Sequence, residues 1–450
     1  MTDAAEPALP LPAKPARWTG WQWYVVGLLL LVNFISGMDR QVIAILMQPM
    51  KADLKLSDAQ LGLVAGPAFA LFYAVSAIPI ARLAERFNRA RILAVLTVFW
   101  SAATGLCGAA VNLTTIALCR VGVGLGEGGA HPIAQSVIAD NFDHRQRGSA
   151  MAIYASGVPI ASTMAPLIAG PAAQIWGWRA AFAVIAVPGV IVALLVALSL
   201  KERRPAAADG AAKPDFRRDF ASLARNPTFV FIFLAGAFNG IGVTGTTAFV
   251  PAFIMRTQGF KLAEVGGLVS ILGVLGFVGA LLGGYLGDRF ADPRGRSYLH
   301  VCSVGAILSL LFFLLAFTQT SWPIIMAGLL VAHLATNLKS GANFAAIQNA
   351  VPSTLRATAP AVFTIASNVI GAGAGALIVG AFSDAAAAHA FGASFPAYKA
   401  ACAMPVGEIA AACKHASADG LRTGLAYVTL TFAGAAACFM LAARNAKIRP

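Results

Sequence analysis

The segment RVGVGLGEGGAHP, residues 120–132, indicates the environment in which this chain folds. It lies within residues 111–139, where Arg120 and Glu127 are the only Lys, Arg, Asp or Glu residues. A charge in an apolar segment of membrane-spanning length is costly, so each one needs a partner or a watery cavity. Glu127 follows Arg120 by seven residues, about 20° short of two turns and roughly 10 Å along the axis, so both project from one helix face. Glycines at 122, 124, 126, 128 and 129 allow neighbouring backbones to come close. We expect this helix to face a polar cavity inside a membrane protein.

The composition places the whole chain in the membrane class. Hydrophobic residues make up 58% of it and charged residues 12%, and the mean hydropathy is +0.74. The run that begins at residue 21 reaches Met38 before its first charge, and no cleavage site follows a short apolar region, so we interpret it as a retained first span. With about 20 residues needed per span, the sequence predicts an all-α protein with twelve transmembrane helices. They lie near 21–48, 58–81, 91–110, 112–139, 147–171, 178–200, 226–256, 262–286, 297–318, 322–349, 355–384 and 421–443.

The positive charges are distributed unevenly along the predicted topology. Of 33 Lys and Arg residues, 22 fall on one side, 8 on the other and 3 within spans. Cytoplasmic loops carry the excess of basic residues in membrane proteins, which accounts for the net charge of +14 without a nucleic-acid partner. We therefore expect a multi-pass protein of a lipid bilayer, the bacterial inner membrane, with both termini cytoplasmic. We also expect it to be monomeric.

The two halves of the chain repeat each other. LAERFNRAR (83–91) corresponds to LGDRFADPRGR (286–296), and Arg147 in RQRGSAMAIY corresponds to Arg356 in TLRATAPAVF. These divisions predict a tail at 1–20, a six-helix bundle at 21–200, a cytoplasmic linker at 201–225 and a second six-helix bundle at 226–450. The end of the linker, DFRRDF, is expected to form a short amphipathic helix. Duplicated halves of this kind are typical of transporters that rock two bundles about a central site.

The second half carries an insertion at residues 385–420. The offset between corresponding arginines rises from 209 for Arg147 and Arg356 to 243 for Arg179 and Arg422, so 34 residues are added on the non-cytoplasmic side. Cys402 and Cys413 both fall in this loop. In an oxidising exterior they form a disulfide that staples the insertion, and otherwise they remain free thiols.

The chain resembles the major facilitator superfamily over essentially its full length. The family's loop between spans 2 and 3 reads roughly G-x-L-x-D-R-x-G-R-[RK]; here residues 81–91 read ARLAERFNRAR and residues 284–289 read GYLGDR. Asn88 stands in place of a glycine and suits a positive-φ turn. The resemblance implies that these loops form a charge latch that closes one of two access states; the alternative is an ordinary basic loop. The candidate latch residues are Glu85, Arg86, Arg89, Arg91, Arg147, Asp288, Arg289 and Arg356.

Three segments carry a closer resemblance, to the Spinster-like transporters. They are NFISGMDR (33–40), ARLAERFNRAR (81–91) and RVGVGLGEGGAHPIAQSVIADNF (120–142). The resemblance implies transport of lysophospholipids or sphingoid-base phosphates, which are anionic amphiphiles. The runner-up is a multidrug or small-organic-anion exporter of the same superfamily.

Five ionisable residues lie away from the ends of the predicted spans: Asp39, Arg40, Arg120, Glu127 and Lys339. Asp39 and Arg40 are adjacent and about 100° apart on a helix, so they pair poorly with each other. We expect Asp39 to pair with Arg120, since an isolated charge in hydrocarbon costs several kcal/mol. One interpretation is a structural ion pair that holds spans 1 and 4 together, although desolvation offsets much of such an attraction.

The other interpretation is a proton and anion site. Burial and a nearby arginine act in opposite directions on a carboxyl pKa, so Asp39 and Glu127 are candidate proton carriers, with a proton gradient as driving force and no cofactor. Guanidinium groups match phosphate and stay charged, so Arg40 and Arg120 are candidates for an anionic head group. The other candidate substrate-binding residues are Lys339, Asn33, His131, Asn337 and Phe344. His333 and Ser340 lie on the same predicted helix as Lys339, and His333 is the kind of residue that more often has a purely structural role.

Two other functional classes lack their signatures. An intramembrane enzyme would need a nucleophile and base set or a metal cluster, such as H-E-x-x-H or G-x-S-x-G, and neither motif occurs. A channel would need a filter loop, which the twelve predicted spans do not provide. We therefore expect a transporter and not an enzyme.

Overall fold

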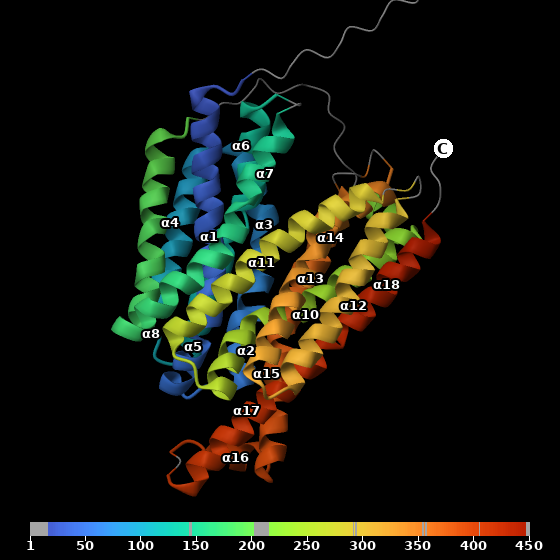
Figure 1. The fold of residues 1–450 in the computed structure, drawn as a ribbon. Coiled ribbons are helices and arrows are strands. Elements are labelled where there is room, and N and C mark those ends of the chain that lie inside the picture. Colours follow the sequence, from blue (N-terminus) through green and yellow to red (C-terminus); the bar gives the residue numbers. More distant parts are fainter. Residues whose placement is uncertain are drawn as a thin grey trace, which may run out of the picture.

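The computed structural model describes residues 17–143, 146–201, 216–290, 292, 295–352, 355, 358–404 and 406–446. In this part of the chain the structure is helical, with no β-strand. The helices stand in two groups that correspond to the two halves of the sequence (Figure 1).

The first group runs from α1 to α8. Its helices are α1 (Gly20–Leu54), α2 (Asp58–Ala65), α3 (Pro67–Arg86), α4 (Arg89–Cys107), α5 (Leu113–Glu127), α6 (Ala130–Asn141), α7 (Arg147–Ala155) and α8 (Gly157–Ser199). The predicted amphipathic segment is helical as α9 (Phe216–Ala224). The second group is α10 (Pro227–Gln258), α11 (Leu262–Arg289), α12 (Arg296–Thr318), α13 (Trp322–Ala350), α14 (Thr358–Ile365), the π-helix η2 (Ala366–Ala372), α15 (Gly373–Phe391), α16 (Phe395–Ala401), α17 (Glu408–Thr429) and α18 (Thr431–Asn445).

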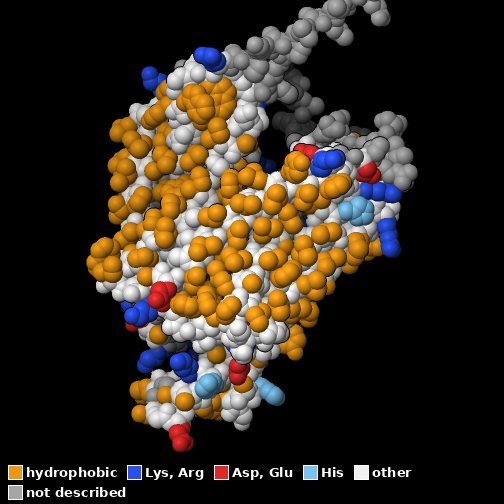
Figure 2. Space-filling model, in the orientation of Figure 1, with side chains coloured by type: hydrophobic (Ala, Val, Ile, Leu, Met, Phe, Trp, Pro, Cys, Tyr) orange, Lys and Arg blue, Asp and Glu red, His pale blue; other side chains and the backbone are white. Residues whose placement is uncertain are grey.

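The helices give the twelve crossings that the sequence predicts. Ten helical segments of the described chain are long and apolar enough to cross a membrane. One of them, Arg147–Ser199, is 53 residues long and is divided by Gly177, whose φ of 83° is not helical. The pair α5 and α6 supplies the remaining crossing, with the break at Gly128 and Gly129. Hydrophobic side chains cover the flanks of both groups, and the charged side chains in view gather near the two ends (Figure 2).

Polar residues at the helix starts set several boundaries. Thr19, Ser57 and Asn112 each accept a hydrogen bond from the main-chain N–H three residues on, which satisfies a donor that the first turn leaves free. Asn88 does the same for Arg91 at the start of α4. Its φ is −63°, so the expectation of a positive-φ turn at Asn88 is wrong, because the residue is a helix cap.

The two halves meet at one end and diverge at the other. α2 packs against α15, and α8 packs against α11. In Figure 1 the groups separate toward the upper edge, where α1 begins and α18 ends, and α16 lies at the lower edge. We call these ends the termini side and the insertion side.

Close contact between α2 and α15 depends on glycine. A Cβ at Gly62 would collide with the main chain at Ala376, and one at Gly380 would collide with the main chain at Asp58. The absence of side chains at these two positions therefore lets the two halves touch backbone to backbone.

Candidate functional site

Two adjoining pockets lie near the middle of the helices, one between the two halves and the other within the second half. The first, about 270 Å³, is lined by α1, α2, α3, α5, α10 and η2, and includes Arg40, Phe69, Tyr73 and Arg120. The second, about 330 Å³, is lined by α10, α13, α14 and η2, and includes Lys339. Val243, Thr244 and Asn368 line both pockets, so the two pockets share a wall.

Glu127 pairs with Arg40 on the wall of the first pocket. The Arg40 Nε lies 2.7 Å from Glu127 Oε2, and the Glu127 side chain is fully buried, whereas 34% of the Arg40 side chain is exposed. Ser36 donates to the same carboxylate oxygen at 2.7 Å. This confirms that the Arg120 and Glu127 face of α5 turns toward α1.

The expected ion pair between Asp39 and Arg120 is not formed. Arg120 Nη1 instead donates to the main-chain oxygen of Asp39 at 3.3 Å. Both carboxylate oxygens of Asp39 are buried and have no hydrogen-bond partner among the described residues, and Asp39 is 0% exposed. The prediction was wrong because it chose the partner from the cost of an isolated charge, and that cost does not determine whether a guanidinium meets a side chain or a carbonyl.

Two aromatic rings hold the guanidinium groups in place. The Arg40 Cζ lies 4.9 Å from the Tyr73 ring centroid, and the Arg120 Cζ lies 4.9 Å from that of Phe69. A cation over a ring face is favourable, most of all where water is excluded. Gly124 allows this arrangement, because a Cβ there would collide with the main chain at Phe69.

Two other candidate residues of the first half are already hydrogen-bonded within the protein. Asn33 donates to the main-chain oxygen of Tyr154 at 2.9 Å. The His131 Nδ1 lies 2.9 Å from the Tyr154 hydroxyl, and its Nε2 lies 2.7 Å from the Gln135 amide nitrogen. Since both ring nitrogens have partners, the geometry favours a positioning role for His131.

Lys339 is the charged residue of the second pocket. It is 2% exposed, and its Nζ lies 4.7 Å from the centroid of the Phe432 ring. Its ammonium has no hydrogen-bond partner among the residues that the structure describes. Ser340 lines the same pocket.

Of the other residues of α13 that the sequence singles out, two line the second pocket and one packs within the protein. Asn337 lines the pocket and donates to the main-chain oxygen of His333 at 3.0 Å. Phe344 also lines it and is half exposed. His333 bonds the oxygen of Leu329 and packs edge-on against Phe313, which is the structural role expected of it.

Sequence reasoning missed the ion cluster that joins the halves on the insertion side. Arg256 donates to both carboxylate oxygens of Asp58, at 2.7 Å each. Lys51 lies 2.7 Å from the same carboxylate. Asp384 accepts from the main-chain N–H groups of Asp58 and Ala59 at 3.0 and 2.8 Å. We call Lys51, Asp58, Arg256 and Asp384 the insertion-side clamp.

The clamp uses a helix start as well as side chains. Asp384 of α15 bonds the first free N–H groups of α2, where the helix dipole favours a negative charge. Asp58 lies in the polar segment LKLSDAQ, residues 54–60, yet it is 2% exposed. The Ser-x-x-Gln capping pattern could have located the helix start, but no local signal identifies a partner about 200 residues away.

The candidate latch residues that the structure describes lie on the termini side. Arg89 pairs with Asp140 of α6 at 2.6 Å, Arg147 donates to the main-chain oxygen of Phe142, and Asp288 accepts from the Tyr298 hydroxyl at 2.7 Å. Glu85, Arg86, Arg91 and Arg289 are exposed. Arg356 lies outside the described residues.

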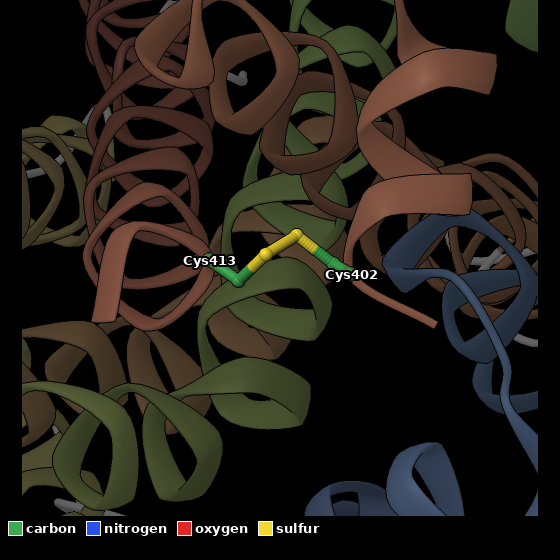
Figure 3. Close-up of a disulfide and its surroundings, with 2 residues drawn as sticks. All are labelled: Cys402 and Cys413. Carbon is green, nitrogen blue, oxygen red and sulfur yellow. A yellow bond between two sulfur atoms is a disulfide. The ribbon is translucent and has the colours of Figure 1, made fainter. Parts of the chain in front are cut away.

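The insertion is held by a disulfide between Cys402 and Cys413, at the end of α16 and within α17 (Figure 3). Tyr398 of α16 is buried beside Ala387 and Ala416. Burial, followed by the negative charge of Asp58, raises the pKa of the Tyr398 hydroxyl. The insertion therefore lies next to the clamp. Among the described residues, no group of three or more His, Cys, Asp or Glu side chains is arranged to hold a metal ion.

Three comparisons relate this geometry to known proteins. The sequence pattern of the Major Facilitator Superfamily matches residues 29–376. An MFS-type efflux pump of Mycolicibacterium smegmatis is 34% identical over 80% of this chain and 84% of its own length. The sphingosine-1-phosphate transporter SPNS2 of Xenopus tropicalis is 25% identical over 83% of this chain and 76% of its own.

A solved structure agrees with the fold over almost the whole chain. It is a bacterial homolog of the human lysosomal transporter Spinster, in an inward-facing and unoccupied conformation, with a TM-score of 0.84 and 29% identity. The match covers 96% of this chain and 98% of that one. The chain belongs to the major facilitator superfamily, as a Spinster-like membrane transporter and not an enzyme.

Proposed function

We propose that this protein is a secondary active transporter that couples proton movement to the transport of an anionic amphiphile, such as a lysophospholipid or sphingoid-base phosphate. The observation that carries the proposal is the buried, unpartnered Asp39 carboxylate beside the Arg40 and Glu127 pair at the cavity wall. A buried carboxyl without hydrogen bonds is stabilised by taking up a proton, and a carboxylate bonded to an arginine is not.

Transport follows by alternating access. The two six-helix halves, residues 21–200 and 226–450, move as two bodies joined by the linker 201–225. The tail 1–20 belongs to neither body. The insertion-side clamp closes one entrance while the cavity is reached from the termini side. The positive-inside distribution puts the termini in the cytoplasm, most simply of a bacterial inner membrane, so the structure corresponds to an inward-open state. The loops with Glu85, Arg89, Asp288 and Arg356 then form the opposite latch.

The charges of the cavity favour an anion. With both carboxyl groups ionised, Asp39, Arg40, Arg120, Glu127 and Lys339 sum to +1; with both protonated they sum to +3. Proton uptake therefore strengthens anion binding, and the linkage is reciprocal. Apolar residues such as Ile43, Phe69 and Ala248 line the first pocket, which suits an apolar chain, and the sphingosine-1-phosphate transporter among the relatives carries such a cargo.

A second candidate is export of drugs or small organic anions. The efflux pump of Mycolicibacterium smegmatis, at 34% identity, favours it. The two candidates share the fold and the charged cavity and differ in the length of apolar chain that the cargo carries.

The experiment begins with native mass spectrometry of the molecules that co-purify with the protein. Uptake of an acyl lysophosphatidate and of a short-chain organic phosphate is then measured in proteoliposomes, with and without a proton gradient. Gradient-dependent uptake of the lysophosphatidate alone supports the first candidate, and uptake of the short-chain phosphate alone supports the second.

A further inference from the structure

The second pocket contains an ammonium without a counter-charge. Lys339 is 2% exposed and contacts the face of Phe432. No described carboxylate forms an ion pair with it, and its Nζ has no hydrogen-bond partner in the described chain. A buried charge is stabilised only by a partner or by losing its proton.

Two asparagines beside it have free polar atoms. Asn343 is one turn further along α13 and 8% exposed, and Asn239 comes from α10. The Oδ1 atom of each is buried without a partner among the described residues. Both line the pocket together with Lys339. A side-chain amide offers either a donor or an acceptor, depending on its orientation.

The arginines of the first pocket are, by contrast, already engaged. Arg40 bonds Glu127 and lies over Tyr73, and Arg120 bonds the main chain at Asp39 and lies over Phe69. Arg120 keeps one donor without a partner in the described chain, its Nε, but Lys339 is the cation of the cavity whose charged group makes no hydrogen bond and no ion pair there.

We propose that Lys339, Asn239 and Asn343 form the subsite for the anionic group of the cargo, a phosphate monoester or carboxylate with hydroxyl or amine groups next to it. This rests on the proposed function and narrows its anion site from three cations to one. The ammonium binds the anion, and the two amides bind the neighbouring polar groups. The apolar chain lies in the first pocket, which joins the second at Thr244 and Asn368.

Binding of two probes to the purified full-length protein tests this. The probes are 1-oleoyl lysophosphatidate and 1-monooleoylglycerol, which share the acyl chain and differ by the phosphate. We expect wild type to prefer the lysophosphatidate by about tenfold or more. The preference should vanish in Lys339→Met and persist in Lys339→Arg. Lys414→Met, at an exposed lysine of α17, is the matched control and should behave as wild type.

Asn343→Leu provides a second variant that keeps the lysine. It should weaken lysophosphatidate binding about fivefold and leave monooleoylglycerol binding unchanged. If Lys339→Met does not fold, this variant decides, because an unchanged affinity in Asn343→Leu overturns the subsite.

Different results would overturn the proposed subsite and the proposed function. A phosphate preference that survives in Lys339→Met overturns the subsite and leaves proton-coupled anion transport standing. A wild-type protein that binds both probes equally overturns the subsite too. Whether that protein still takes up lysophosphatidate in response to a proton gradient then decides separately about the proposed transport function.

Discussion

At the residue scale, the site consists of groups that are paired and groups that are not. The Glu127 carboxylate bonds Arg40 and Ser36, while the carboxylate oxygens of Asp39 have no hydrogen-bond partner in the described chain. The two carboxyl groups are therefore unlike: one restrains an arginine, and the other is free to bind a proton.

Glu127→Gln should strengthen the binding of an anionic probe at neutral pH. The substitution removes the charge that neutralises Arg40, so lysophosphatidate affinity at pH 7.5 should rise about tenfold. Isothermal titration at pH 6.0 and 7.5 measures this, with the exposed Glu408→Gln as control. An affinity that matches wild type at both pH values would contradict the linkage.

Asp39→Asn should uncouple transport from the proton gradient. Because neither carboxylate oxygen accepts a hydrogen bond in the described structure, the substitution should spare folding. Gradient-driven uptake should fall to the level without a gradient, while exchange of labelled for unlabelled substrate continues. Asp419→Asn, at an exposed position, should change neither the gradient-driven uptake nor the exchange. Gradient-driven uptake that persists in Asp39→Asn would remove this residue from the coupling.

At the element scale, α2, α10 and α15 are joined by the insertion-side clamp. Sequence reasoning located the helices and could not find this junction. The capping pattern at Ser57 gives the start of α2. The partners of Asp58, however, are Arg256 and Asp384, and whether they reach Asp58 depends on how the two halves dock. Likewise, spacing placed Arg120 and Glu127 on one face, and only the rotation of α1 decides that Arg40 meets Glu127.

Asp58→Asn should open the insertion side. Loss of one member of a buried ion pair costs about 3–5 kcal/mol. Here the loss destabilises the arrangement in which the insertion side is closed. Hydrogen exchange of the peptides that contain the start of α2 and the end of α15 should become faster by at least about tenfold.

The matched control is Asp53→Asn, whose partner Arg179 belongs to the same half and is exposed at the surface. It should leave exchange at α2 and α15 unchanged. Equal exchange in Asp58→Asn and wild type would show that the clamp does not hold this entrance closed.

The disulfide should stabilise the insertion locally. Cys402 and Cys413 close a short loop, and a link of this kind contributes about 2–3 kcal/mol. Reduction should therefore speed hydrogen exchange in α16 and leave α4 unaffected. Mass spectrometry of the non-reduced protein first establishes the bond, and finding both residues as free thiols would contradict it.

At the scale of the whole molecule, the duplication in the sequence was sufficient to predict the fold. Corresponding loops at 83–91 and 286–296 fixed two six-helix halves, and the apolar runs fixed the crossings. The π-helix η2 was not predictable, because its local sequence reads as a continuous helix; it places Asn368 where both pockets meet. The molecule is closed by the clamp at one end, and its cavity carries charges from both halves.

Proton movement that accompanies the cargo tests the central claim most directly. Proteoliposomes with a pH-sensitive dye inside are given 1-oleoyl lysophosphatidate, and the internal pH is followed in wild type and in Asp39→Asn. The account predicts a change of internal pH in wild type that depends on the lysophosphatidate and is absent in Asp39→Asn. Uptake of the lysophosphatidate by wild type with no change of internal pH would contradict it.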